Sequence, residues 1–245
     1  ELQTFDFDTN ADNTLIHQPY SKFHTTGLTI DPSASTGSGV TVTASASYFE
    51  SNHVGVTLRY HNSEILITGY TSATVVTGTV QGNLKQQLDI NALRTIDGSA
   101  SIEVTHVAHG LSTNDSIAIT EAATVAGISA SNINGTRTVT SVVDENRYRI
   151  TAASGTANAS VDGGGAPVIT THAPTTDFSE QSYSLVRGYP AAVAFHEGRL
   201  WFGGSTSQPD TLWGSKSNEF FNFDLGTAAD NDSIELLASI GEINT

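Results

Sequence analysis

The chain has 245 residues, of which 10 are Lys or Arg and 25 are Asp or Glu, so its formal net charge is −15. It contains no Cys, which excludes disulfides, thiolate metal sites and cysteine nucleophiles. The negative charge repels phosphate, so tight sequence-specific binding of DNA or RNA is not expected. Apolar runs such as 191–195 are far shorter than the roughly 20 residues of a membrane helix, so no membrane-spanning segment is expected.

The sequence also contains no Met and begins with Glu1. A complete gene product of this length without Met would be unusual. We therefore expect the chain to be a fragment of a longer protein or a processed form of one.

Alternation of apolar and polar residues, between turns rich in Gly, Asn and Ser, dominates the chain and predicts strands. Signals for helices are confined to short stretches at 44–52 and 86–93. The sequence therefore predicts an all-β fold, with β-propeller-like or β-sandwich sheets. In chain order, the predicted strands cover 40–43, 55–60, 64–67, 74–80, 101–105, 115–119, 136–143, 148–150, 191–195, 200–202 and 210–215.

Two turn signals, at 96–99 and at the Gly-rich run 162–167, divide the chain into three segments. Their basic and acidic residues number 4 and 8, 3 and 7, and 3 and 10, giving −4, −4 and −7, and the last segment holds both Trp. We expect 1–95 to be the first part of a β domain and 96–166 an inserted small β-barrel-like module. Residues 167–245 would continue the main domain as a β-propeller-blade-like unit.

The candidates for metal chemistry are weak. His106 and His109 lie three residues apart, but they follow a strand and have no nearby carboxylate or third His, which favours a polar turn. The acidic stretch 224–235 lacks the alternating oxygen ligands and the Gly of an EF-hand loop. It is predicted to be a solvated loop, although a looser ion site there stays open.

Hydrolase and phosphate-binding signatures are missing as well. The sequence has no Gly-x-Ser-x-Gly elbow and no Gly-rich loop with a Lys. Paired carboxylates for glycoside cleavage stay open, because their separation depends on the fold, but Asp144 and Glu145 resemble a hairpin turn. We predict no catalytic, cofactor-binding or metal-binding residues, no cofactor and no enzymatic activity.

The most distinctive residues are in the last segment. Strands at 191–195 and 200–202 flank the turn His196-Glu197-Gly198-Arg199, in which Gly198 supplies a positive φ. With a third strand at 210–215 and an aromatic segment at 218–224, this stretch resembles one blade of a β-propeller. Five aromatic residues are predicted to form one core cluster: Trp201, Phe202, Trp213, Phe220 and Phe223.

Four blocks of this segment resemble the tail proteins of short-tailed bacteriophages known as the tail tubular protein B or nozzle group. The blocks are Arg-Gly-Tyr-Pro at 187–190, Gly-Arg-Leu-Trp-Phe-Gly-Gly at 198–204, Thr-Leu-Trp-Gly-Ser at 211–215 and the aromatic stretch 220–224. Upstream, 46–55 and 65–74 are similar to the segment that usually precedes the first block. The middle segment resembles a small β module common in phage structural proteins.

The resemblance implies a structural virion protein located in the phage tail. Such a protein would be a homo-oligomeric ring with six-fold symmetry that contacts other phage tail or adaptor proteins and serves as a conduit for DNA ejection. An acidic lumen would let DNA pass without specific binding, because like charges repel. The alternative is a carbohydrate-binding β module or adhesin for host-surface glycans, in which Trp201, Trp213 and Tyr189 line a groove.

Overall fold

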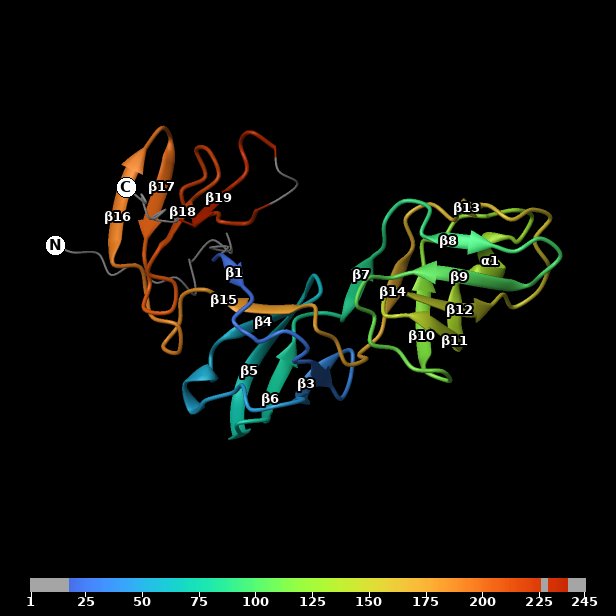
Figure 1. Ribbon diagram of the computed structural model, residues 1–245, viewed down its shortest axis with the longest axis horizontal. Coiled ribbons are helices and arrows are strands. Elements are labelled where there is room, and N and C mark those ends of the chain that lie inside the picture. The colour runs from blue at the N-terminus through green and yellow to red at the C-terminus, as the bar shows by residue number, and fades with distance from the viewer. Residues whose placement is uncertain (1–17, 226–228, 238–245) are drawn as a thin grey trace, which may run out of the picture. The chain divides into compact units, whose positions relative to one another are not determined.

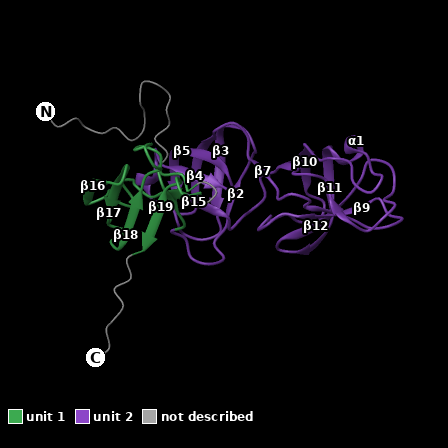
Figure 2. Ribbon diagram, turned by 90° about the horizontal axis from the view of Figure 1, so that it is seen from above, with its two compact units in different colours: residues 1–22, 180–245 green, residues 23–179 purple. Residues whose placement is uncertain are grey.

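The computed structural model describes residues 18–225 and 229–237, which divide into two compact units (Figures 1 and 2). Unit 1 comprises the described residues of 1–22 and 180–245, and unit 2 comprises 23–179. The sheets are antiparallel, which confirms the predicted all-β fold class. Helical structure among the described residues is limited to the 3₁₀ turn η1 (Ser51–His53) and the short helix α1 (Ala130–Ile133).

The first sheet of unit 2 has the strand order β15-β4-β5-β6-β3-β2. Its alternating side chains bury one face, which gives a core that includes Val42, Leu58 and Ile65. The predicted hairpin at 55–67 is confirmed, and it turns at His61, whose φ is +50°. The strands are β2 (Ile30–Pro32), β3 (Gly37–Ala44), β4 (Thr57–Tyr60), β5 (Ser63–Ser72), β6 (Val75–Val80) and β15 (Phe178–Gln181).

The second sheet of unit 2 has the order β13-β8-β9-β12-β11-β10-β14-β7. The prediction of helical turns at 86–93 is wrong, because Gln86 and Gln87 belong to a strand and Leu93 begins the next strand. The predicted turn at Asp144-Glu145 is confirmed, between β11 and β12. The strands are β7 (Lys85–Gln87), β8 (Leu93–Thr95), β9 (Ser101–Thr105), β10 (Ser116–Thr120), β11 (Gly135–Asp144), β12 (Arg147–Thr151), β13 (Asp162–Gly163) and β14 (Val168–Thr170).

This second sheet forms a module with its own core, which runs from Leu88 to Ala173. The chain enters the module through β7 and leaves it through β14, and these two strands pair with each other. The predicted segment 96–166 lies inside this span, between a first segment 1–95 and a last segment 167–245, and the division into these domains stays a prediction. The turn signal at 96–99 lies inside the module because it joins β8 to β9 of the same sheet.

Unit 1 contains a four-stranded sheet in the order β16-β17-β18-β19. The predicted hairpin is confirmed: His196 pairs with Arg199, and both central turn residues, Glu197 and Gly198, have positive φ. At the start of unit 1, β1 (Tyr20–Ser21) pairs with the last two residues of β15. The four strands are β16 (Ala192–His196), β17 (Arg199–Gly203), β18 (Thr211–Gly214) and β19 (Ile234–Leu237).

The predicted aromatic cluster of unit 1 is correct in part. Phe202, Trp213 and Phe223 lie in the buried core with Tyr183 and Leu200. Trp201 lies on the other face of β17, since neighbouring residues of a strand point to opposite sides. Phe220 is 37% exposed and contacts the ring of Phe195 instead.

Candidate functional site

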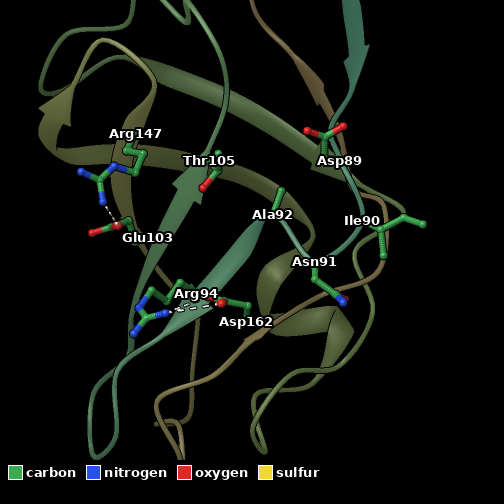
Figure 3. Close-up of a pocket in the computed structure, with 9 residues that line it drawn as sticks. All are labelled: Asp89, Ile90, Asn91, Ala92, Arg94, Glu103, Thr105, Arg147 and Asp162. Atoms are coloured by element: carbon green, nitrogen blue, oxygen red, sulfur yellow. Dashed lines mark hydrogen bonds and ion pairs between the residues drawn. The ribbon is translucent and has the colours of Figure 1, made fainter.

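A polar groove of about 500 Å³ opens in the second sheet of unit 2 (Figure 3). Glu103 and Thr105 project into it from β9, because residues two apart in a strand share a face. The remaining walls come from β8, β12, β13 and the turn before β8. The groove is lined by Asp89, Ile90, Asn91, Ala92, Arg94, Glu103, Thr105, Arg147 and Asp162.

The charges of this groove are largely matched by ion pairs. The carboxylate of Glu103 is mostly buried and accepts hydrogen bonds from Arg147 Nη1 at 3.2 Å and Arg149 Nη2 at 3.0 Å. Arg94 Nη1 donates to Asp162 Oδ1 at 3.1 Å (Figure 3). The groove therefore offers paired charges and hydrogen-bonding groups to a polar molecule, without the aromatic surface on which sugars stack.

Asp144 lies beside this groove and pairs with Arg147. The guanidinium of Arg147 donates to the Asp144 carboxylate at 2.7 Å, and this hydrogen bond, followed by that from the Asn146 backbone N–H, lowers the pKa of Asp144. A general acid of the glycosidase type needs a raised pKa. The environment of Asp144 shifts its pKa in the opposite direction.

A second candidate site is a row of buried histidines in unit 2. His61 lies in the turn after β4, whereas His106 and His109 follow β9 of the module. The ring centroids of His61 and His106 are 5.6 Å apart, and those of His106 and His109 are 6.1 Å apart. The row thus links the turn of the first sheet to the module.

Hydrogen bonds fix the orientation of the His106 and His109 rings. His106 Nε2 donates to Gln86 Oε1 at 2.7 Å, while its Nδ1 faces the Tyr148 hydroxyl at 3.4 Å. His109 Nδ1 accepts the backbone N–H of Leu111 at 2.8 Å, which assigns the proton to Nε2. In this tautomer, His109 Nε2 donates to the backbone carbonyl oxygen of Asp144 at 2.9 Å, so both ring nitrogens of His109 have a partner.

Burial also opposes the charging of His106. It lowers the pKa of His106 to about 3, with smaller contributions in the same direction from His61 and His109. Asp177, which lies 3.2 Å from His61 Nδ1, acts in the opposite direction. The chain does turn at 106–109, as predicted, but the two histidines are buried and His106 contacts His61. The sequence could not show this contact because His61 is 45 residues away.

The residue pattern of a metal site is not present around these histidines. Among the residues that the structure describes, no three His, Asp or Glu side chains lie close enough together to hold a metal ion. Within the acidic stretch 224–235, Asp232 is mostly buried, and its Oδ1 lies 3.4 Å from Lys216 Nζ. Asp232 is therefore not part of a fully solvated loop.

No helix in the part of the chain that the structure describes is long and apolar enough to span a membrane.

The aromatic residues of unit 1 serve mainly as packing. Trp213 is 1% exposed, and its ring meets that of Tyr183 edge-on at 5.1 Å. Trp201 is half-buried and lies over Gly214, where a Cβ atom would come within about 3.0 Å of the indole ring. Tyr189 is 51% exposed. Of the three residues that would line a sugar-binding groove, Trp213 is inaccessible in this structure.

Two arginines from the resemblance blocks also have internal partners. Arg187 Nε donates to Glu180 Oε1, and the Glu180 side chain is fully buried. Arg199 is 7% exposed and donates to the backbone carbonyl oxygens of Ser215, Asp230 and Asp232. The sequence placed Arg199 in a hairpin turn but did not indicate that it holds a distant loop.

Comparisons with known proteins add little to this geometry. A comparison with protein-family models finds no match, and neither does one with curated proteins. Among solved structures, the chain is similar to an endosialidase of phage phi92, with a TM-score of 0.32 and 12% identity over 90% of this chain. The chain spans about half (48%) of that protein's length. At this level of similarity, the match assigns neither a fold nor an activity to the chain.

Proposed function

We propose that this chain is part of a structural virion protein that forms a ring in the tail of a short-tailed bacteriophage and passes DNA. The observation that carries the proposal is the role of the residues on which the resemblance rests. Arg187 pairs with buried Glu180, and Trp213 fills the core. Arg199 donates to the backbone carbonyl oxygens of Ser215, Asp230 and Asp232. These residues support a scaffold, which fits a structural role better than a catalytic one.

The charge distribution of unit 1 supports passage of DNA without binding. Each of the three basic side chains between 180 and 237 has an internal partner: Arg187 contacts Glu180, Arg199 contacts backbone carbonyls, and Lys216 lies 3.4 Å from Asp232. The exposed charges there are acidic and include Glu197, Asp210, Glu219 and Asp230. A surface with this arrangement repels the phosphates of DNA.

Electron microscopy of the intact parent protein with its tail partners tests this proposal. We expect closed rings, with six copies around a central channel, that attach to the tail complex. A parent protein that stays monomeric and never joins a tail complex would contradict the proposal. The same preparation should not retard DNA in a gel at low salt, where electrostatic attraction is strongest.

The carbohydrate-binding alternative has fewer accessible aromatic residues than the sequence predicted. Burial of Trp213 removes one of its three aromatic residues, whereas Tyr189 stays exposed. Titration with host-surface glycans, followed by Tyr189→Ala, tests what remains. Saturable binding that is lost in this variant would favour the alternative over the tail-ring role.

A further inference from the structure

The four-stranded sheet of unit 1 has two edges, β16 and β19, and both are apolar. All five residues of β16 are exposed, including Val193 at 66% and Phe195 at 68%. At the other edge, Leu236 and Leu237 of β19 are 49% and 75% exposed. Within the described part of the chain, neither outer edge pairs with a further strand.

Two exposed side chains of β16, those of Val193 and Phe195, belong to the face of the sheet that carries the core. Val193 lies opposite Phe202 in the β16–β17 ladder, and Phe195 lies opposite Leu200. Directly opposite residues of an antiparallel pair point to the same side. Since Phe202 and Leu200 are part of the buried cluster, Val193 and Phe195 extend that cluster beyond the edge of the unit.

Neither edge carries the devices that usually prevent strand addition. Free edges are commonly protected by Lys, Pro or a β-bulge. β16 contains none of these, and its ladder with β17 has no register shift. β19 has the sequence Ile-Glu-Leu-Leu, in which Glu235 is the charged residue. Both edges are therefore suited to accept another strand.

The two edges match each other in their exposed apolar side chains, so a second copy of this chain can occupy them. Two copies at −15 each repel one another across most of their surfaces. They can approach at low electrostatic cost where acidic side chains are few. The Ala192–Phe195 part of β16 has no charged residue, and Glu235 of β19 faces Trp213 within its own sheet.

Strand direction fixes how the two edges can combine. In an antiparallel sheet of four strands, β16 and β19 run in opposite directions. A second copy's β16 placed beside β19 therefore continues the antiparallel alternation. Leu237 shares the core face with Trp213, because Leu237 pairs with Thr211, two residues before Trp213. Apolar side chains of the same face thus meet across the new pair.

We propose that β16 of one copy pairs with β19 of the next, so that unit 1 sheets join head to tail. The inference rests on the proposed ring and names the surface through which its copies meet. Such heterologous contacts close into a ring if the rotation between copies permits it and otherwise produce a filament.

Engineered cysteines test the pairing directly, because the natural chain contains no Cys. Phe195→Cys and Leu237→Cys are combined in one chain, which is oxidised at high protein concentration. The two positions lie at opposite edges of a four-stranded sheet, roughly 14 Å apart at about 4.8 Å per strand. A disulfide within one chain cannot span that distance, so any disulfide must join two copies.

We expect the double variant to form covalent multimers of increasing size and neither single variant to form multimers. Disulfide-linked dimers from Phe195→Cys alone would overturn the proposal in favour of a two-fold contact between two β16 strands. The absence of cross-links in the double variant would also overturn it. If the uncross-linked chain still forms closed rings by native mass spectrometry, the proposed function survives and this inference alone fails.

A charge variant gives a second, independent measurement. Val193→Glu places an anion on the exposed β16 edge, and Val107→Glu places one at a similarly exposed site of unit 2, where Val107 is 56% exposed. Both side chains are exposed enough for the fold to tolerate them. We expect Val193→Glu to lower the multimer fraction at least tenfold and Val107→Glu to leave it unchanged. Equal multimer fractions in the two variants would overturn the proposal.

Discussion

The rings of His61 and His106 lie 5.6 Å apart between centroids, although the two residues belong to different sheets of unit 2. His61 is 8% exposed and His106 is 1% exposed. The Nε2 atom of His61 has no hydrogen-bond partner among the described residues. The two imidazoles are therefore packed together in a buried site, and a proton on His106 is costly there.

The burial of His106, with a smaller contribution from His61, makes the stability of unit 2 dependent on pH. The native pKa of His106 is about 3, whereas an unfolded His titrates near 6.5, so the unfolded state binds the proton first. The stabilising contribution of neutral His106 is thus complete above pH 6.5 and is lost as the pH falls toward 3. The expected loss is roughly 1.4 kcal/mol per pH unit within this window.

Chemical denaturation of wild type and His106→Gln between pH 7.5 and 4 measures this effect. The variant keeps a hydrogen-bonding group beside Gln86 and removes the titrating imidazole. Carboxylates contribute equally to both proteins, so the difference between the two slopes isolates His106. Parallel slopes would show that His106 does not control the acid sensitivity.

Gly110 is predicted to be intolerant of a side chain. Its φ is +61°, and a Cβ atom would overlap the backbone carbonyl of Pro174. We expect Gly110→Ala to destabilise unit 2 by several kcal/mol, because backbone atoms must move. Gly98→Ala is the matched control, since Gly98 has a φ of +71° but open space around its Cβ position. Thermal unfolding that is equal in both variants would argue against the close contact with Pro174.

Trp213 is predicted to be the main support of the unit 1 core. Trp213→Ala should cost about 3–5 kcal/mol in the free energy of unfolding, as is usual for a buried aromatic residue. The control is Leu212→Ala, in the same strand but on the opposite, 41% exposed face, with an expected cost below about 1 kcal/mol. Trp201→Phe leaves Trp213 as the single Trp, and its fluorescence should be blue-shifted. Emission at the wavelength of a solvated indole would contradict the burial.

The buried pair of Arg187 and Glu180 gives a fourth prediction. Arg187→Gln removes the cation that faces the fully buried Glu180 side chain, with an expected cost of about 3–5 kcal/mol. Adding Glu180→Gln should recover part of this loss, since an amide needs no counter-charge. A double-mutant cycle by urea denaturation measures the coupling between the two residues. Strictly additive effects would show that the pair is not coupled.

The sequence is sufficient to predict those elements whose structure depends on residues that are neighbours in the chain. The hairpin at 192–203 follows from its turn, in which Gly198 favours a positive φ, and from alternating strands on both sides. The turn between β11 and β12 was equally local. The prediction of helical turns at 86–93 is wrong, because β7 pairs with β14, more than 80 residues later in the chain. This pairing overrides the weak local preference of these residues for a helix.

The candidate sites depend on contacts between distant residues, and the sequence could not predict these. His61 meets His106 across 45 residues, and Arg199 reaches the carbonyl of Asp232 across 33. The groove brings Glu103 and Arg147 together from strands 44 residues apart. The sequence analysis placed Trp201 and Phe202 in one core cluster, whereas the alternation of β17 puts Phe202 in the core and Trp201 on the other face.

The pairing of β7 with β14 has a mechanical consequence. Lys85 and Thr170, the points where the chain enters and leaves the module, lie directly opposite each other in that ladder. Tension along the polypeptide can therefore pass between these two positions without stretching the polypeptide of the module. The eighty-odd residues between β7 and β14 therefore bear little of a force that is applied to the rest of the chain. The module could be exchanged for another without changing the path of the chain on either side.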